Sequence, residues 1–250
     1  MIEQALKKND YSAVVLGLAN LVLLARNRPG SRLCVDRILN QYLQRIDFRE
    51  VPEVYRYRLL KELFNIYYEW GNWPKAFSYL SRMKLIDKEL SIFTPTDDWI
   101  PGLIRWREGH LLWILNRSKT QLLSSISIAE EGLGYLQANM NNNSNPAGYC
   151  SSLMNTGWLH FLNNNPICID YFELAIKTLS GNSPRSEIES KVGYYIACLR
   201  FKRGSRLDAF AQLKLLFNEL HYHNLPLRNY LFLANEPEWI ELSKYLNIIG

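Results

Sequence analysis

Apolar side chains recur at every third or fourth position through most of this 250-residue chain. Such spacing places them on one broad face of a helix. Only 13 glycines and 10 prolines interrupt the chain, which favours long helices over many short strands. No alternating apolar and polar run bounded by turn residues, the signature of a strand, stands out. The pattern predicts an all-α fold, and its clearest example is Leu59, Leu60, Leu63, Phe64, Tyr67 and Tyr68.

Turn signals divide the helical pattern into pairs. Gly71 and Asn72 end one helix, and Trp73-Pro74 opens the next, because proline is tolerated in a first helical turn. Two helices joined by so short a turn pack antiparallel as a helical hairpin. Linkers are expected at 91–101 and 139–148. Further helices are predicted over 103–115, 122–133, 149–162, from Pro166 onward, over 187–202, over 207–216 and near 236–248.

The helical pairs form a repeat. Ala76, Gln121, Cys168 and Ala209 fall at equivalent places near the start of each second helix, at a spacing of 41 to 47 residues. A period in this range is typical of a stacked array. A single helical pair cannot bury both of its faces, so it stacks on its neighbours into a continuous core.

The chain resembles the tetratricopeptide-repeat family. The matching segment is Leu60-x-x-Leu63-Phe64-x-x-Tyr67-x-x-x-Gly71-x-Trp73-x-x-Ala76-x-x-x-Leu80, in which Phe64 replaces the small residue of the family pattern. The resemblance extends over 56–220, and its spacing exceeds the usual 34 residues. It implies an α-solenoid of antiparallel helix pairs forming one domain over 1–250. That domain would comprise N-terminal helices in 1–50, a repeat core in 51–220 and a C-terminal capping helix in 221–250.

The first helix of each pair lines the groove of such arrays, which makes its polar stripe a candidate binding site. Lys61 and Asn65 resemble half of the carboxylate clamp by which some family members hold the C-terminus of a partner. An ammonium and an amide can both donate hydrogen bonds to a carboxylate. The other half of the clamp is not evident, and a plain solvated face is the alternative. The stripe comprises Arg58, Lys61, Asn65 and Tyr68.

Three aromatic residues share one face of the helix predicted over 103–115. Trp106, His110 and Trp113 follow at steps of four and three residues. Exposed in a groove, they would form an aromatic platform for a peptide, because aromatic residues dominate binding hot spots. Packing against a neighbouring helix is the alternative, since large aromatic side chains bury well.

Basic residues cluster twice in a chain of net charge +5 and pI 8.9. With interleaved tyrosines they could bind single-stranded RNA. A solvated helix surface with local ion pairs is the alternative. The candidates for nucleic-acid contact are Arg45, Arg49, Arg56, Arg200, Lys202 and Arg203.

No motif indicates catalysis, a cofactor or a metal site. The nucleotide-binding, zinc-protease and nucleophile-elbow patterns do not occur, and the pair His221-x-His223 lacks further ligands nearby. The four cysteines form no C-x-x-C, which indicates reduced thiols and a cytoplasmic location. The apolar run Ala13–Ala25 is too short to span a membrane, which takes about 20 residues.

These observations predict a non-catalytic adaptor or regulatory module that binds a peptide or protein partner in its concave groove, on its own or as a subunit of a larger complex. The first alternative is a single-stranded RNA-binding helical-repeat protein. The second is a helical enzyme whose site is assembled from residues far apart in the sequence.

Overall fold

A computed structural model describes residues 2–26, 31–89, 99–138, 146–179, 184–222, 230 and 232–246. Within these residues the predicted all-α fold is confirmed, because the structure comprises α-helices and short 3-10 turns without a strand. The chain divides into two compact units, unit 1 (Met1–Ile92) and unit 2 (Phe93–Gly250). Each unit is described by itself. The single domain over 1–250 remains a prediction.

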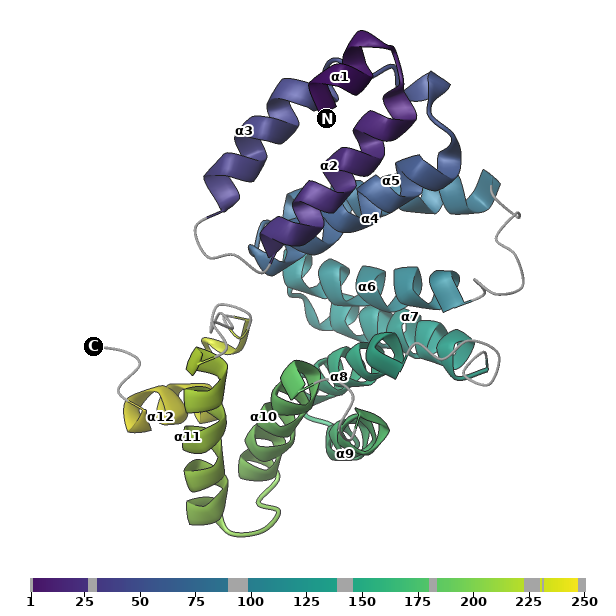
Figure 1. The fold of residues 1–250 in the computed structure, drawn as a ribbon. Coiled ribbons are helices and arrows are strands. Elements are labelled where there is room, and N and C mark those ends of the chain that lie inside the picture. Colours follow the sequence, from purple (N-terminus) through teal and green to yellow (C-terminus); the bar gives the residue numbers. More distant parts are fainter. Residues whose placement is uncertain are drawn as a thin grey trace. The chain divides into compact units, whose positions relative to one another are not determined.

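The described residues of unit 1 form five α-helices and a 3-10 turn, and Figure 1 shows how these helices are arranged. Helix α2 packs against α1, α3 and α4, and α4 packs against α5. Asp10 begins α2 by accepting a hydrogen bond from the amide of Ala13, at 3.0 Å. The core of the unit lies where the apolar faces of α2, α4 and α5 meet. The elements are α1 (Ile2–Lys7), α2 (Tyr11–Arg26), α3 (Arg32–Leu43), η1 (Phe48–Glu50), α4 (Glu53–Glu69) and α5 (Trp73–Glu89).

The part of unit 2 that the structure describes forms three helical hairpins and a further helix after them. Each hairpin packs its two helices together, as α6 with α7, α8 with α9 and α10 with α11. Successive hairpins also touch, because α8 contacts α6 and α7, and α10 contacts α8 and α9. The elements are α6 (Trp99–Asn116), α7 (Lys119–Ala138), α8 (Pro146–Leu162), α9 (Cys168–Leu179), α10 (Pro184–Arg200), α11 (Arg206–Tyr222) and α12 (Pro237–Tyr245).

The predicted turns of the hairpins are confirmed at their glycines. Gly71 and Gly204 have φ of +70° and +84°, a region in which side chains with a Cβ are strained. Asn72 begins α5 by accepting a hydrogen bond from the amide of Lys75, at 3.4 Å. Local residue chemistry therefore sets the end of α4 and the start of α5. At the end of α10 the first left-handed residue is Lys202, with φ of +53°, and Gly204 lies two residues beyond it.

Several predicted boundaries were wrong by a few residues at helix starts. Helices α6 and α8 begin at Trp99 and Pro146, inside the segments expected to be linkers. Helix α10 begins earlier than predicted, at Pro184, and ends at Arg200. Proline fits a first turn because it has no amide hydrogen to leave unpaired. Pro166, which was expected to open a helix, lies in a turn before α9.

Small residues allow close helix packing in unit 2. A Cβ on Gly109 of α6 would lie 2.4 Å from the carbonyl oxygen of Ser125 in α7. The backbones of α6 and α7 therefore approach too closely for any larger side chain at position 109. Three of the four equivalent positions of the repeat carry buried side chains, namely Ala76, Cys168 and Ala209. The fourth, Gln121, is half-buried.

Candidate binding site

A groove of 490 Å³ lies within unit 1, between the end of α3, η1, and the facing sides of α4 and α5. We call it the unit 1 groove. Among the described residues that line it, the charged ones are two arginines. The described lining residues are Leu43, Gln44, Phe48, Arg56, Leu59, Leu60, Leu63, Tyr79, Arg82, Leu85 and Ile86.

Helical spacing creates this lining. Leu59, Leu60 and Leu63 project from one side of α4, at i, i+1 and i+4. Tyr79, Arg82 and Ile86 project from one side of α5, at i, i+3 and i+7. The α4–α5 hairpin brings these two sides together, and the short segment after α3 closes one end. Residues from three parts of the chain therefore share one concave surface.

The rim of the groove exposes apolar surface to solvent. Leu85 is 63% exposed, whereas Leu59 and Leu63 at the floor are buried. Covering a leucine of this size contributes about 1.5–3 kcal/mol to binding before the costs of association. The groove therefore has a buried apolar floor and a rim that an apolar ligand would cover.

Two guanidinium groups set the charge of the groove. Arg56 donates a hydrogen bond from one terminal nitrogen to Glu53 Oε1, at 3.0 Å. Its Nε is buried and has no hydrogen-bond partner in the structure. Arg82 is exposed, and no ion pair joins it to another described residue. A buried donor without a partner costs about 1–3 kcal/mol, so the Arg56 Nε favours an acceptor in the groove. The exposed Arg82 guanidinium is hydrated and attracts an anionic acceptor through its charge.

Tyr79 adds a neutral polar group. Burial raises the pKa of Tyr79 above its ordinary value of 10.0, while the positive charge of Arg82 acts in the opposite direction. Its ring stacks on Tyr67, with centroids 5.5 Å apart. The hydroxyl therefore stays protonated at neutral pH and can donate a hydrogen bond.

The predicted stripe on α4 lies on a different side of the helix from the groove. Arg58 donates a hydrogen bond to Asn20 Oδ1 of α2, at 3.1 Å, and Asn65 is buried. Lys61 Nζ lies 4.0 Å from Glu62 Oε1, and the Tyr68 ring stacks on Phe64. Part of the stripe therefore serves the contact between α4 and α2.

The groove residues Phe48, Tyr79 and Arg82 were not predicted from the sequence. The sequence feature that could have indicated the groove is Leu85, an apolar residue on the outer side of α5.

The predicted aromatic platform lies in the core of unit 2. His110 and Trp113 are buried, and both rings make edge contacts with Phe232, with centroids 5.9 and 6.4 Å apart. Phe232 also contacts Trp158 of α8, at 5.4 Å. These contacts favour the packing alternative over the peptide platform. The side chain of Trp106 lies outside the described residues.

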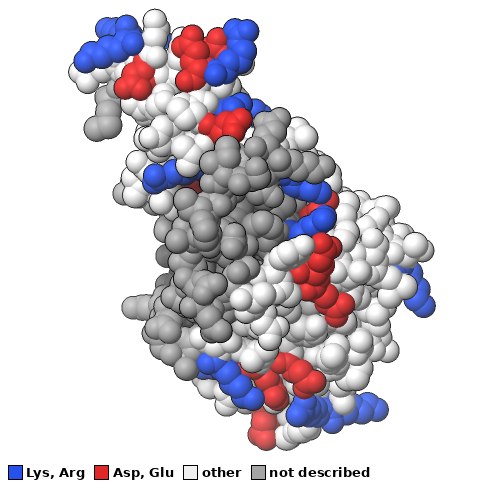
Figure 2. Space-filling model, turned by 90° about the vertical axis from the view of Figure 1, so that its right-hand side faces the viewer, with Lys and Arg blue, Asp and Glu red and all other residues white. Residues whose placement is uncertain are grey.

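Most predicted nucleic-acid contacts are engaged within the chain. Arg45 pairs with Glu3 at 2.8 Å, and Arg49 pairs with Asp47 at 2.8 Å. Arg200 is 11% exposed and pairs with Glu236 and Glu238, the latter at 2.6 Å. A phosphate would have to displace these carboxylates. On the face drawn in Figure 2, basic and acidic groups lie beside one another.

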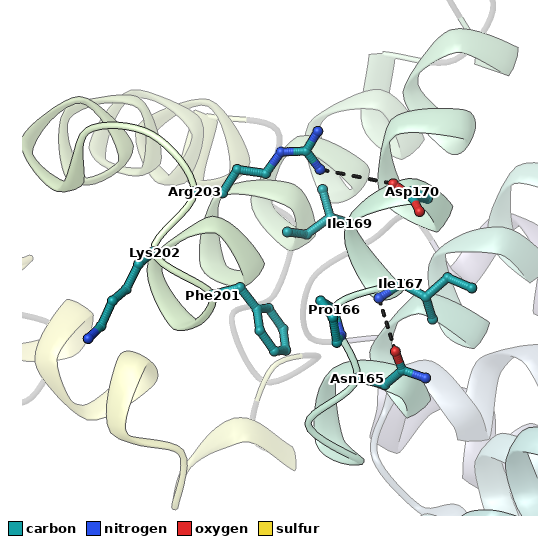
Figure 3. A pocket seen from close by; sticks show the side chains of 8 residues that line it. All are labelled: Asn165, Pro166, Ile167, Ile169, Asp170, Phe201, Lys202 and Arg203. Carbon is teal, nitrogen blue, oxygen red and sulfur yellow. Dashed lines mark hydrogen bonds and ion pairs between the residues drawn. The ribbon is translucent and has the colours of Figure 1, made fainter.

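Arg56 of the predicted set pairs with Glu53, and the last two residues, Lys202 and Arg203, border a shallow pocket of 510 Å³ in unit 2 (Figure 3). The pocket lies between the turns that precede α9 and α11. Phe201 points toward Pro166, Arg203 reaches toward Asp170 at 4.0 Å, and Lys202 points away. Glu173 also lies 3.7 Å from Arg203. Two carboxylates thus offset the charge of Arg203, which makes the pocket a poor phosphate site.

The part of the chain that the structure describes holds neither a cluster of metal-ligating side chains nor a membrane-spanning helix. No cluster of three or more histidine, cysteine, aspartate or glutamate side chains suited to a metal ion occurs there. His223 lies outside this part. No described helix is both long enough and apolar enough to cross a membrane.

Comparison with known proteins yields no match: no family model fits the sequence, and neither a curated protein nor a solved structure is similar to it.

Proposed function

We propose that this chain is a non-catalytic helical-repeat module that binds a segment of a partner protein. The observation that carries the proposal is the unit 1 groove, whose apolar floor and exposed rim suit an inserted apolar side chain. Grooves between paired helices commonly accept amphipathic partner segments in this way. The tetratricopeptide resemblance adds that binding, rather than chemistry, is the usual role of such scaffolds.

The packing of unit 2 supports the solenoid part of this proposal. In a stacked array each first helix contacts its own partner, the preceding first helix and the preceding second helix. Helix α8 contacts α9, α6 and α7, and α10 contacts α11, α8 and α9. We accordingly propose a tetratricopeptide-like α-solenoid in which unit 2 contributes three hairpins. A cytoplasmic location, where all four cysteines would stay reduced, is part of the same proposal.

The binding site is tested by affinity purification of tagged protein from its native cell extract, with and without nuclease. Leu85→Glu places a charge on the groove rim. Leu33→Glu makes the same change on α3 outside the groove, at a side chain 79% exposed. A stoichiometric protein that survives nuclease and is lost only with Leu85→Glu supports the proposal. We expect at least about a tenfold loss of binding, because burial of one leucine is at stake.

Two other results would contradict it. Equal recovery of the partner by both variants would move the binding site away from the groove. Loss of every companion on nuclease treatment would favour the RNA-binding alternative. That alternative receives less support from the ion pairs of Arg45, Arg49 and Arg200.

A further inference from the structure

The charged groups among the described lining residues of the unit 1 groove are of one sign. The two guanidinium groups of Arg56 and Arg82 border an apolar floor, and no carboxylate stands among these described residues. Glu53 lies outside the lining and occupies one terminal nitrogen of Arg56. The Nε of Arg56 remains without an acceptor. A ligand that fills this groove completely would have to satisfy these donors.

Apolar ligands without an acceptor fit this surface poorly. Covering Arg82 with hydrocarbon would remove its guanidinium from water without replacing the lost hydrogen bonds, and the buried Nε of Arg56 would stay without an acceptor. A carboxylate satisfies a guanidinium better than any neutral acceptor, because the hydrogen bonds are charge-assisted and can be bidentate. A basic ligand would meet two like charges at close range, which costs affinity and slows association.

The shape of the groove favours a polypeptide ligand. Its floor runs along two paired helices, and its rim is open at Leu85, which is 63% exposed. An isolated acyl chain is held best by an enclosed apolar cavity, whereas an open groove along helices suits an amphipathic segment with apolar anchors. Tyr79, neutral and partly buried, offers one further hydrogen bond at the wall.

We propose that the unit 1 groove recognises an acidic amphipathic segment of a partner protein. One or two leucine- or phenylalanine-sized side chains enter between Leu60, Leu63 and Ile86. An aspartate or glutamate of the same segment pairs with Arg82 and accepts a hydrogen bond from Arg56. This assignment rests on the proposed function and adds the chemistry of the partner.

The test is selection of binders from a random-peptide phage library on immobilised full-length protein. Wild type is expected to enrich peptides in which aspartate or glutamate accompanies leucine or phenylalanine. Arg82→Glu reverses the charge at an exposed position, so it leaves the fold intact. Selection on Arg82→Glu is expected to enrich lysine or arginine beside the same apolar residues. Acidic peptides taken from the wild-type selection should bind Arg82→Glu at least about tenfold more weakly.

The outcomes separate this inference from the proposed function. Apolar peptides without a charge preference on wild type, lost on Leu85→Glu, would overturn the acidic assignment and leave the groove as a protein-binding site. Unchanged affinity of acidic peptides for Arg82→Glu would also overturn the assignment. Peptides that bind wild type and Leu85→Glu equally would overturn the site itself. Displacement of selected peptides by a fluorescent fatty acid at micromolar concentration would assign the groove to acyl chains instead.

Discussion

Gly193 of α10 lies directly against the ring of Phe172 in α9: a Cβ on Gly193 would come within 2.4 Å of Phe172 Cε1. Phe172 is fully buried and also contacts Trp158 of α8, with centroids 5.0 Å apart. Its ring therefore has no free space into which it could move. Because position 193 carries no side chain, α9, the second helix of one hairpin, can pack closely against α10, the first helix of the next hairpin.

Replacing Gly193 with alanine should consequently destabilise the protein. Overpacking of this kind costs about 1–3 kcal/mol, which exceeds the gain in helix propensity of up to about 1 kcal/mol. Gly134→Ala on α7 is the matched control, because its Cβ meets nothing within 4 Å and should stabilise the helix slightly. Chemical denaturation monitored by circular dichroism measures both. Equal stability of the two variants would show that the α9–α10 contact is looser than described.

Local signals predicted the presence of the helices and some of their ends. The left-handed φ of Gly71 and Gly204 follows from residue chemistry within a single turn. Helix α8 begins at Pro146, although an asparagine-rich linker was expected to reach position 148. Proline ends a linker and opens a helix equally well, so composition alone does not fix the boundary. The sequence therefore predicts which helices exist more accurately than it predicts the residue at which each helix begins.

The binding surface could not be predicted because it depends on which neighbour each helix face meets. Helix α4 has an apolar side carrying Leu59 and Leu63 and a more polar side carrying Arg58 and Asn65. Periodicity identifies both sides but not their partners. The polar side contacts α2 through Asn20, and part of the apolar side is left as the groove. Likewise, the contact of His110 with Phe232 joins residues far apart in the chain, which no local pattern encodes.

The stability of unit 2 should fall in mild acid because of His110. Burial lowers the pKa of His110 from 6.5 to about 4. The unfolded chain therefore binds a proton between pH 6.5 and 4 that the folded chain does not, and stability present above pH 6.5 is lost as the pH falls. Between pH 7 and pH 5 the loss amounts to about 2 kcal/mol.

The comparison of wild type with His110→Gln isolates this contribution, since all carboxylates are common to both proteins. The free energy of unfolding from urea titrations at pH 7 and pH 5 gives the difference. The variant is expected to lose about 2 kcal/mol less than wild type over this interval. An equal loss in both proteins would mean that His110 is protonated in the folded state.

Arg200 should be a major contributor to the stability of the C-terminal part of unit 2. Burial disfavours the charge of this guanidinium, but hydrogen bonds to Glu238 and Glu236 outweigh that effect and raise its pKa. The group also lies 3.6 Å from the centroid of the Phe161 ring and donates a hydrogen bond to the Phe161 carbonyl oxygen, at 2.9 Å. Arg200→Met leaves two partly buried carboxylates without a partner, which should cost about 3 kcal/mol.

The control for Arg200→Met is Arg203→Met, at a side chain 53% exposed whose contacts with Asp170 and Glu173 are 4.0 and 3.7 Å. Exposed pairs contribute about 0–1 kcal/mol, so this variant should unfold nearly as wild type does. Thermal unfolding followed by tryptophan fluorescence distinguishes the two, because Trp239 lies on the segment that Arg200 holds. If Arg200→Met lowers the free energy of unfolding by less than about 1 kcal/mol, the ion pairs of Arg200 do not contribute as buried pairs should.

The four cysteines should differ sharply in reactivity toward alkylating reagents. The thiolate is the reacting form, and burial raises the pKa of Cys150 to about 11 and that of Cys168 to about 12. Burial raises the pKa of Cys198 as well. Cys34 on α3 is exposed. Iodoacetamide at pH 8 should therefore modify Cys34 alone in the folded protein, and peptide mass spectrometry reads out the site.

Cys34→Ser should remove the fast reaction, leaving a slow one that denaturant accelerates. Rapid modification of Cys150 or Cys168 without denaturant would mean that the packing of α8 and α9 opens far more readily than their burial indicates.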